Sequence, residues 1–451
     1  MIFIDTLIII VRITKLVAII SYELTNYVII KSINNLYKIP TNRLELIKAL
    51  AQRLEYENIV YVKLFQALCL NKDLLYSNEQ DFLIKYTDNV PYTINDINYD
   101  LLDKLKQEYC ITLNSAIPIN SGIIGLIFDA RDCSNNKVVV KMLKQNILKK
   151  FTNVFDELLY VSYICKYIPY IKYYKITKLL LDNREILLNQ MNFIKEVETI
   201  EIFTKKYKNN KEYRFPKVYK AITEKYAELM VMENINGLHL KDILVMDNTI
   251  KEEFAYLINK FNILGILYHS VIHCDLHCGN VFFYINDANA DANADTNAVS
   301  NTEQHPKYML GLIDFGLCSF PNKESQNAYY VFFNNMLYAN DYSEIEYLIT
   351  NFIEEKELFS NYSNSIKQVL YYETISCLDL YASQKITIQA LANKLGELFY
   401  NYDLNFTREV NRIILSLHTT YSFIALLTSD VNFSITKVIK ELNYFNELIN
   451  I

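Results

Sequence analysis

Two short segments of the chain carry the residue types that phosphoryl transfer requires. The first contains Asp275 and Asn280, which lie five positions apart, and the second begins at Asp314. Moving a phosphoryl group takes a side chain that handles the proton of the acceptor, together with carboxylate or amide oxygens that hold magnesium. The sequence offers candidates for both tasks, separated by 39 positions between Asp275 and Asp314.

The spacing of these residues matches the two loops that protein kinases use. Residues 273–280 read HCDLHCGN and fit the pattern H-x-D-x-x-x-x-N, and residues 314–316 read D-F-G. Apolar residues flank both loops, which predicts two short strands with metal ligands at their ends. A zinc site is the alternative, but neighbouring residues on one helix or strand do not converge on one ion, so the kinase pattern is favoured. That zinc site would use His273, Cys274, His277 and Cys278.

A lysine and a glutamate upstream complete the set that a kinase needs. Lys141 lies in the β-branched run VVVKM, the strand position from which a kinase lysine reaches the phosphates of ATP. Its usual partner is a glutamate on the next helix. Glu196 lies in an apolar helical pattern, formed by Phe193, Val197, Ile200 and Phe203. Either residue alone is more often a solvated surface charge, so order and context carry this argument.

A glycine-containing turn and a later apolar strand are candidates for binding the nucleotide. The segment 118–125 reads PINSGIIG and holds Ser121, Gly122 and Gly125 one strand ahead of the lysine. Glycine permits close backbone approach to phosphates and turns with positive φ, although a strand glycine is as often a bulge. The segment 228–234 reads ELMVMEN, and its end at Glu233 and Asn234 suits a hinge that pairs with adenine; a simple core strand is the compatible alternative.

Taken together, these motifs resemble one family, the UbiB/aarF-domain (ADCK) atypical kinases. HCDLHCGN is similar to the HADPHPGN loop of that family, and LMVMENINGLHL resembles its V-M-E-Y-x-x-G stretch. Upstream, Lys63 and Gln66 fall in a segment that resembles the K-x-G-Q helix. The match covers roughly residues 45–330 with the motifs in order, and order across independent patterns is what makes chance a poor explanation.

The resemblance implies a fold, an activity and residue roles. It implies a kinase-like fold with a helical extension over the active site, ATP and Mg²⁺ as cofactors, and kinase-like or ATPase activity on a small molecule or lipid at membranes, connected with quinone biosynthesis. By position, Lys141 would bind phosphates, Glu196 would pair with it, and Asp275 would act as the base. The magnesium ligands would be Asn280 and Asp314, and the extension would contribute Lys63 and Gln66.

Three departures from the family pattern stand out. Phe65 occupies the glycine position of K-x-G-Q, and a phenyl ring there would push the helix away from any close backbone contact. Residues 190–192 read QMN where the family has E-x-D, so two carboxylates have become amides. The alanine-rich nucleotide loop has become Asn120-Ser121-Gly122, closer to an ordinary kinase glycine loop.

The elements that must position these residues follow from periodicity. Residues 41–110 read as helices, Lys137–Leu143 as a strand after a turn at Asn135-Asn136, Phe215–Ile222 and Tyr226–Glu233 as strands, and the chain from Lys241 onward as mostly helical. The fold class is therefore predicted as α+β: a bilobal kinase-like fold with a small antiparallel sheet lobe, a helical lobe and an N-terminal helical extension. The predicted domains are 1–40 (apolar helix), 41–113 (extension), 114–236 (N-lobe) and 237–451 (C-lobe).

One segment is predicted to be a disordered surface insertion. Residues 286–307 repeat Asp, Ala and Asn with almost no hydrophobic content, so they cannot bury enough surface to order themselves. A calcium loop is the alternative, but the segment lacks the glycine and the closing glutamate of such a loop. As a loop insertion, the segment accounts for about twenty of the residues between the two kinase motifs.

Composition bounds the class of protein and its compartment. The chain has 451 residues, is 51% hydrophobic and 21% charged, and carries a net charge of −6, which gives no basic field for nucleic acid. Heavy use of Ile, Asn, Lys and Tyr indicates AT-rich coding, as in viral or parasite genomes. The eight cysteines form no C-x-x-C pair and no signal peptide is evident, so we expect a reduced intracellular compartment and mostly core cysteines.

The first 30 residues are the candidate membrane element. They are strongly apolar but contain Asp5, Arg12, Lys15 and Glu23, so the longest uncharged run falls short of the ~18 residues of a spanning helix. Arg12 and Lys15 are three apart and share one helix face. Packing on the protein and lying on a membrane surface both remain open.

The sequence leaves the phosphoryl acceptor open. No A-P-E motif follows the D-F-G segment, which argues modestly against a protein substrate. An active small-molecule or lipid kinase or ATPase is the main prediction. A catalytically weak nucleotide-binding scaffold and a protein serine/threonine kinase are the alternatives, and the oligomeric state is not predicted.

Overall fold

The computed structural model describes two compact units of the chain. It describes residues 2–39, 41–58, 60–61, 92–165, 188–286, 306–429 and 437–441, together with Glu79, Phe82, Val90 and Arg184. The sheet unit comprises Met1–Lys195 and Val218–Asn234, and the helical unit comprises Glu196–Lys217 and Ile235–Ile451. An antiparallel-sheet unit and a helical unit make up the predicted bilobal α+β fold, which is confirmed.

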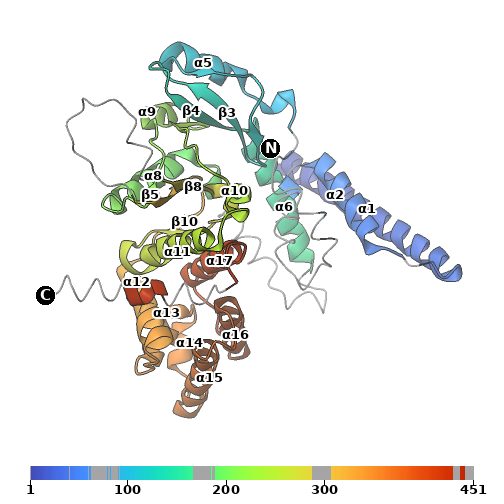
Figure 1. The fold of residues 1–451 in the computed structure, drawn as a ribbon. Helices are drawn as coiled ribbons and strands as arrows, with labels where there is room; N and C mark the ends of the chain where they lie inside the picture. The colour runs from blue at the N-terminus through green and yellow to red at the C-terminus, as the bar shows by residue number, and fades with distance from the viewer. Residues whose placement is uncertain are drawn as a thin grey trace, which may run out of the picture. The chain divides into compact units, whose positions relative to one another are not determined.

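A five-stranded antiparallel sheet forms the centre of the sheet unit (Figure 1). Its backbone order is β1-β3-β4-β6, with β2 paired to β3. Residues alternate between buried and partly exposed along β3 and β4, as period-2 side chains require. The predicted strand at Lys137–Leu143 is confirmed as β4. The strands are β1 (Thr112–Leu113), β2 (Asn120–Ser121), β3 (Gly125–Arg131), β4 (Lys137–Leu143) and β6 (Leu229–Glu233).

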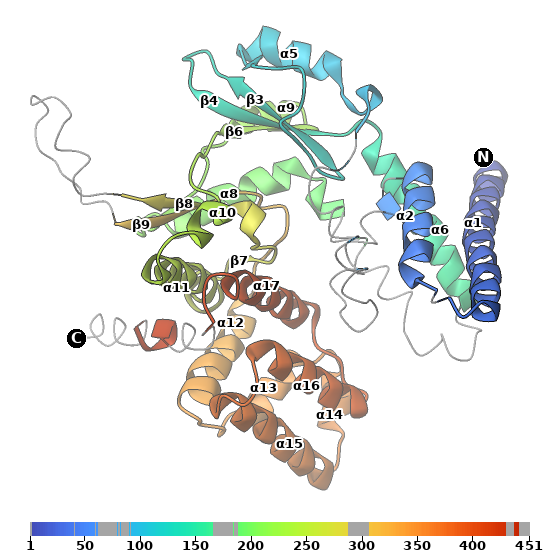
Figure 2. The same ribbon diagram turned by 45° about the vertical axis from the view of Figure 1, so that its right-hand side comes forward.

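Helix α5 (Tyr99–Tyr109) covers one face of this sheet (Figures 1 and 2). Its Leu101, Leu102 and Leu105 pack in one buried cluster with Phe128 of β3 and Val140 of β4. The β3–β4 connection turns at Asn135, which adopts φ 65°, a left-handed conformation that asparagine tolerates better than most residues. The predicted turn at Asn135-Asn136 is therefore confirmed.

Three helices form a second part of the sheet unit. They are α1 (Ile2–Leu36), α2 (Arg43–Glu57) and α6 (Ile147–Cys165). Three charged residues of α1 form ion pairs with α2 and α6: Arg12 with Glu157 at 3.6 Å, Lys15 with Glu57 at 2.6 Å, and Glu23 with Arg53. Packing of α1 on the protein is therefore confirmed. By length and composition, Ile10–Leu36 is also the one helix of the described chain that is apolar and long enough to cross a membrane.

The helical unit carries the remaining helices and two small sheets (Figure 2). Strands β8 (Val281–Ile285) and β9 (Tyr308–Leu312) pair antiparallel, β5 (Tyr213–Arg214) joins β9 in parallel, and β7 (Ile272–His273) pairs with β10 (Cys318–Ser319). The longer helices are α8 (Phe193–Lys206), which begins in the sheet unit, α11 (Asn248–Leu264), α12 (Lys323–Tyr330), α13 (Ile345–Phe352), α15 (Asn364–Ala382), α16 (Ile388–Asn401) and α17 (Arg408–Ile424).

One predicted strand is wrong. Phe215–Ile222 contains a single bridge, from Val218 to Met232, and ends in helix α9 (Lys220–Lys225). The chain passes from the helical unit to the sheet unit between Lys217 and Val218. Phe215 packs among aromatic rings of the helical unit. The apolar residues of this run therefore pack first in one unit and then in the other, and they do not form one face of a strand.

Gly265→Ala is predicted to destabilise the helical unit by about 2 kcal/mol. Gly265 begins the π-helical turn η3 (Gly265–His269) that leads from α11 to β7, and a Cβ there would overlap the backbone carbonyl oxygen of Val271. Chemical denaturation followed by circular dichroism measures the loss. The control is Gly396→Ala in α16, where the nearest atom, Phe406 Cε2, is 3.4 Å away. Equal stability of the two variants would contradict the prediction.

Candidate active site

The H-x-D-x-x-x-x-N loop starts from a strand pair in the helical unit. His273 ends β7 and stands opposite Cys318 of β10, and the N–H of Cys274 donates to the carbonyl of Leu317 at 2.9 Å. The residues that follow the D-F-G segment are thereby fixed beside the start of the first loop. Ser416 of α17, which is fully buried, donates from Oγ to the carbonyl oxygen of His273 at 2.9 Å.

Hydrogen bonds within the loop set the orientation of Asn280. Its side-chain Nδ2 donates to the carbonyl oxygen of Asp275 at 3.0 Å, and its backbone N–H donates to the carbonyl of His277 at 2.9 Å. Since the amide nitrogen is engaged by Asp275, the amide oxygen is the end of the side chain that can serve a cation. Asn280 is only 6% exposed, so few other conformations are open to its side chain.

The β8–β9 pair brings Asn280 and Asp314 to one place. Val281 stands opposite Leu312, and the N–H of Ile313 donates to the carbonyl of Asn280 at 3.0 Å. Asn280 precedes the first strand and Asp314 follows the second, so both lie at the same end of the hairpin. The two predicted short strands with candidate metal ligands at their ends are confirmed as strands.

Asp314 occupies a constrained backbone conformation. Its φ of 60° lies in the left-handed region, where aspartate is enriched relative to most residues but still strained. Its Oδ1 accepts the N–H of Gly316 at 3.3 Å. The next residue, Phe315, is buried against Phe203 of α8 and against the ring of His273, with ring centroids 4.9 and 5.1 Å apart. Packing of Phe315 therefore holds Asp314 in this turn.

The Cys318 thiol of β10 is buried in this part of the helical unit. Burial raises the pKa of the Cys318 thiol well above its usual value, and Cys274, Glu196, Asp314 and Asp275 raise it further. Glu196 itself is only 2% exposed. The residues that fit Mg²⁺ by their chemistry are Asn280 and Asp314, because amide and carboxylate oxygens are the ligands that this ion prefers.

The zinc alternative gains no support from the geometry. Within the described ranges no three or more His, Cys, Asp or Glu side chains are arranged to hold a metal ion. Cys274 is buried, and burial raises the pKa of its thiol to about 12, whereas Cys278 is exposed. The four proposed zinc ligands therefore do not converge.

His277 belongs to the site, although the sequence suggested it only as a zinc ligand. Its Nε2 lies 3.9 Å from Asp275 Oδ2, and its Nδ1 accepts the N–H of Gly279 at 3.1 Å. Burial alone would lower the pKa of His277, but Cys278, Asp275 and Asp314 together raise it above its usual value. A proton on Nε2 would therefore face Asp275. The only sequence signal for this role was that the His-Cys pair occurs twice in HCDLHCGN.

Lys141 lies in the sheet unit on β4, opposite Ile127 and Met230. Its Nζ is 5.4 Å from the ring centroid of Phe193, where α8 begins. Glu196 belongs to the helical unit, so its pairing with Lys141 stays a prediction. The helical pattern around Glu196 is confirmed, because Phe193, Val197, Ile200 and Phe203 are all buried.

The candidate nucleotide-binding residues of the sheet unit are placed less simply. Ser121 is buried rather than open to a ligand, and neither Gly122 nor Gly125 has positive φ, so the conformational reason for expecting glycine there is wrong. Gly125 instead gives room to β4, since a Cβ would lie 3.0 Å from the Met142 carbonyl oxygen. Glu233 ends β6, and the backbone N–H of Asn234 donates to the carbonyl oxygen of Lys137 at 3.2 Å.

Two further expectations concern the neighbouring segments. Lys63, Phe65 and Gln66 lie outside the described residues, as does most of the 286–307 insertion. The Q-M-N departure is described: Asn192 Oδ1 accepts the N–H of Lys195 at 3.0 Å, so this amide caps the helix that carries Glu196. The substitution that removed a carboxylate from the family pattern retains a local structural role.

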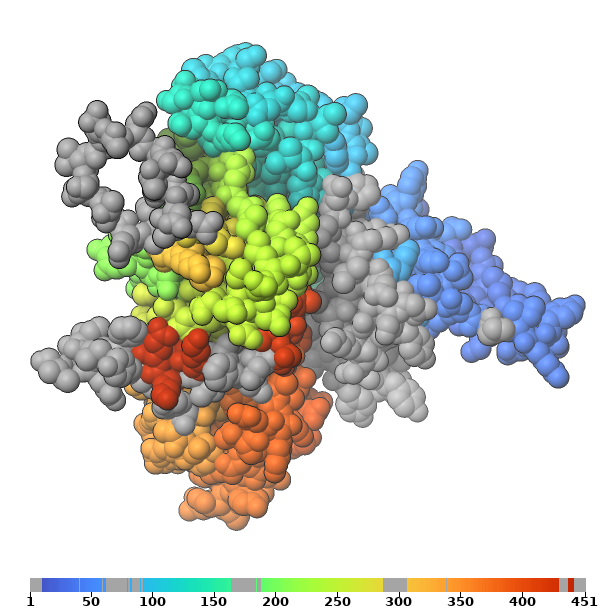
Figure 3. All heavy atoms as spheres, in the orientation of Figure 1, coloured from blue at the N-terminus to red at the C-terminus, as the bar shows by residue number. Residues whose placement is uncertain are grey.

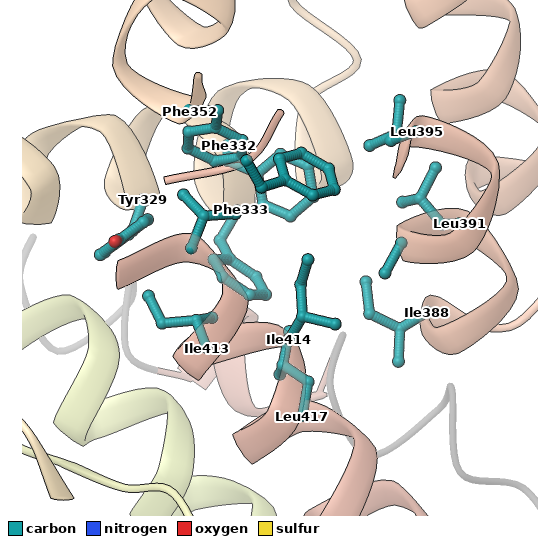
Figure 4. A pocket seen from close by; sticks show the side chains of 13 residues that line it. Tyr329, Phe332, Phe333, Phe352, Ile388, Leu391, Leu395, Ile413, Ile414 and Leu417 are labelled. Atoms are coloured by element: carbon teal, nitrogen blue, oxygen red, sulfur yellow. The ribbon is translucent and has the colours of Figure 1, made fainter. Parts of the chain in front are cut away.

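Figure 4 shows a cavity elsewhere in the helical unit, and it is too small to be a substrate site. It measures about 40 Å³ and is lined by apolar side chains of α12, α13, α16, α17 and the π-helical segment η6 (Val331–Tyr338). A cavity that holds benzene measures about 150 Å³. We therefore interpret it as a gap in packing among Phe332, Phe333 and Phe352.

Ser416→Ala is predicted to cost about 1–2 kcal/mol, because it leaves the buried carbonyl of His273 without its side-chain donor. The loss is measured by chemical denaturation. Ser376→Ala in α15 is the matched control, since that exposed hydroxyl donates only to the carbonyl of Tyr372 in its own helix. A cost for Ser416→Ala no larger than for the control would overturn this assignment.

Comparisons with known proteins agree with the motifs. A model of the ABC1 atypical kinase-like domain matches residues 98–348. A protein described as "Probable protein kinase UbiB" from Blochmanniella pennsylvanica is 26% identical over 237 residues, covering 51% of this chain and 39% of its own length. Its counterpart from Shewanella sp. (strain ANA-3) is 24% identical over 325 residues, covering 69% and 54%. The chain thus spans about half the length of the curated relatives it matches.

Solved structures with detectable similarity are distant. The Rv3197–erythromycin complex from Mycobacterium tuberculosis has a TM-score of 0.48 and 14% identity, covering 94% of this chain and 98% of that one. The Rio2 kinase from Chaetomium thermophilum has a TM-score of 0.31 and 10% identity, covering 85% and 94%. The family model spans more than half of the chain, and the loops that it includes hold the site described above. This chain therefore belongs to the ABC1 atypical kinase-like family, the UbiB/ADCK group of the protein-kinase-like superfamily.

Proposed function

We propose that this protein is an ATP- and Mg²⁺-dependent atypical kinase or ATPase of the UbiB/ADCK type that acts on a small molecule or a lipid. The observation that carries the proposal is the hairpin geometry that sets Asn280 beside the Asp314 turn, with the backbone of Asp275 bonded to the Asn280 amide. Membership of a family whose relatives are described as kinases supports the same activity.

The proposed mechanism assigns one task to each side chain. Asn280 and Asp314 would hold Mg²⁺, which when bound neutralises charge on the phosphates of ATP. Asp275 accepts the proton of the attacking hydroxyl or water, and His277 lies beside that carboxylate, with Nε2 3.9 Å from Asp275 Oδ2. Lys141 binds the phosphates and Glu196 orients its ammonium group.

The nucleotide contacts are part of the same proposal. Ser121 at the end of β2, Gly122 in the turn that follows and Gly125 at the start of β3 would shape the backbone that covers the phosphates. The adenine would pair at Glu233 and Asn234. Lys63 and Gln66 would reach the nucleotide from the extension, as the family resemblance implies.

Asp314→Asn and Asp275→Asn are predicted to fail at different steps. Asp314→Asn removes a charged magnesium ligand, so ATP with Mg²⁺ should no longer raise the thermal unfolding midpoint. Asp275→Asn leaves that ligand in place, so the thermal shift should persist while ATP turnover falls by about a hundredfold or more. Thermal shift and phosphate release, each with and without Mg²⁺, measure the two effects.

The control for these variants is Asp103→Asn on the exposed surface of α5, which should match wild type in both assays. Nucleotide binding without turnover by the wild type would favour the scaffold alternative. If the wild type showed neither Mg²⁺-dependent ATP binding nor turnover, the proposed function would be rejected. Screening lipid extracts and peptides as acceptors separates a lipid kinase from a protein kinase.

A second part of the proposal is that α1 docks on a lipid surface. The ion pairs of Arg12, Lys15 and Glu23 all face α2 and α6. The opposite face is apolar, and several of its side chains are about half exposed, such as Val17 at 50% and Val28 at 58%. Figure 3 shows α1, in blue, at the surface of the molecule.

The hydroxyl groups of α1 support the same interpretation. Thr14, Thr25 and Ser32 are exposed, yet each donates to the carbonyl oxygen four residues earlier in the helix, at 2.7–2.8 Å. Their hydrogen bonds are therefore satisfied without water, which is the condition that a lipid environment imposes on polar groups. An exposed apolar face with internally bonded hydroxyls fits the acyl region of a bilayer.

Val17→Asp combined with Val28→Asp is predicted to reduce liposome binding at least about tenfold, because each carboxylate must enter the apolar part of the bilayer. Co-sedimentation with phosphatidylcholine vesicles measures the loss. Val245→Asp, at a position 86% exposed in the helical unit, is the control and should bind as wild type does. Failure of the wild type to bind vesicles, or lipid-free dimerisation lost in the double variant, would contradict lipid docking.

A further inference from the structure

Two cysteines far apart in the sequence come together at the edge of the sheet unit. Strand β1 pairs with β3 so that Thr112 stands opposite Arg131 and Leu113 opposite Ala130. Cys110 lies two residues before Thr112 and ends helix α5, and Cys133 lies two residues after Arg131 in the turn that leads to β4. Both cysteines therefore lie just beyond the same end of this strand pair.

A local hydrogen bond brings the Cys133 sulfur beside the backbone that leads into Cys110. Cys110 ends α5 with φ 54°, and its N–H donates to the carbonyl of Lys106 at 3.1 Å. The Cys133 sulfur lies 3.2 Å from the carbonyl oxygen of Tyr109, the residue just before Cys110, and accordingly donates to it. A hydrogen bond between the two thiol groups also raises the pKa of Cys133, with burial adding to the shift.

Both cysteines are free and exposed, which sets them apart from the buried sulfur atoms near the candidate active site. Most cysteines are expected in the core, and Cys110, Cys133 and Cys278 are exposed exceptions among those that the structure describes. Exposure matters because a small oxidant must reach the thiols. Among the six cysteines that the structure describes, this is the pair that combines exposure with a shared hydrogen bond.

We propose that Cys110 and Cys133 form a reversible disulfide when the protein meets a peroxide, so that the end of α5 becomes covalently tied to the β3–β4 turn. The oxidant is a hydroperoxide, and the reductant that reverses the bond is a low-molecular-weight thiol. This site is independent of phosphoryl transfer, since neither cysteine is among the residues assigned to ATP or Mg²⁺.

The reaction balances in two steps. The thiolate of Cys110 attacks the peroxide, taking one oxygen as a sulfenic acid and releasing the alcohol, or water from hydrogen peroxide. The Cys133 sulfur then attacks the sulfenic sulfur, which releases a second water and forms the S–S bond. Two thiols thus lose two hydrogens and two electrons, and the peroxide is reduced. Because the thiol of Cys133 donates its hydrogen to the carbonyl oxygen of Tyr109, that sulfur is held protonated and Cys110 is the first nucleophile.

The bond would constrain the sheet unit rather than create a new contact. It closes the segment from Cys110 to Cys133, which contains β1, β2 and β3. Cross-linking restricts the unfolded chain more than the folded one. The oxidised protein should therefore show a higher thermal unfolding midpoint than the reduced protein.

The test uses the full-length protein, reduced and then treated with hydrogen peroxide. Free thiols are alkylated under denaturing conditions, and peptide mass mapping follows all eight cysteines. The expected result is a peptide pair joined between residues 110 and 133, about 2 Da lighter than the two reduced peptides. Treatment with glutathione should separate the pair and restore two alkylatable thiols.

Cys110→Ser and Cys133→Ser should each abolish the linked peptide and the rise in unfolding midpoint on oxidation. Cys377→Ser, in α15, should retain both. The proposal is overturned if peroxide leaves both thiols free, oxidises them singly without a bond, or joins either one to another cysteine or a second chain. ATP turnover is measured in parallel, and loss of turnover in all variants alike would not bear on the disulfide.

Discussion

The pairing of β8 with β9 is the constraint on which the candidate active site depends. Asn280 and Asp314 are separated by a long stretch of sequence, yet the register Val281↔Leu312 leaves them at the same end of one hairpin. The hydrogen bond from Ile313 to the carbonyl of Asn280 extends the pairing to the residues themselves. Backbone pairing of the two strands therefore positions Asn280 and Asp314, which lie at one end of the hairpin.

A second set of contacts keeps the loops in their conformations. Phe315 is buried between Phe203 and His273, and Asp314 is held with positive φ beside it. Ser416 anchors the carbonyl of His273 from α17. The aromatic core beside the site thus links α8, β7 and the D-F-G turn within the helical unit. A shift of one of these elements would therefore displace the others.

Much of this arrangement was predictable from the sequence, because motif spacing and β-branched runs are local signals. The run KVVVKML gave the bounds of β4, and the two kinase loops gave the candidate ligands. Phe215–Ile222 was not predictable in this way, since an apolar run that passes between two cores has the same composition as a strand. The role of His277 beside Asp275 and the burial of Ser121 depend on tertiary contacts that no local pattern reports.

Helix α1 and the pair Cys110 and Cys133 also show that composition does not predict tertiary contacts. Apolar composition suggested a helix, but only the ion pairs to α2 and α6 reveal which of its faces is turned inward. Similarly, the meeting of Cys110 with Cys133 requires the β1–β3 register, which composition does not contain.

The hairpin that ends at Asn280 and Asp314 also explains how a long connection between its strands is tolerated. Asn286 closes the other end of the strand pair. Its backbone N–H donates to the carbonyl oxygen of Lys307 at 2.8 Å, and its Nδ2 donates to the carbonyl oxygen of Pro306 at 2.8 Å. Beyond such a closed end, each doubling of loop length costs only about 0.6 kcal/mol of closure entropy. A long connection at that end is therefore compatible with the other end, five residue pairs away, where Asn280 and Asp314 lie.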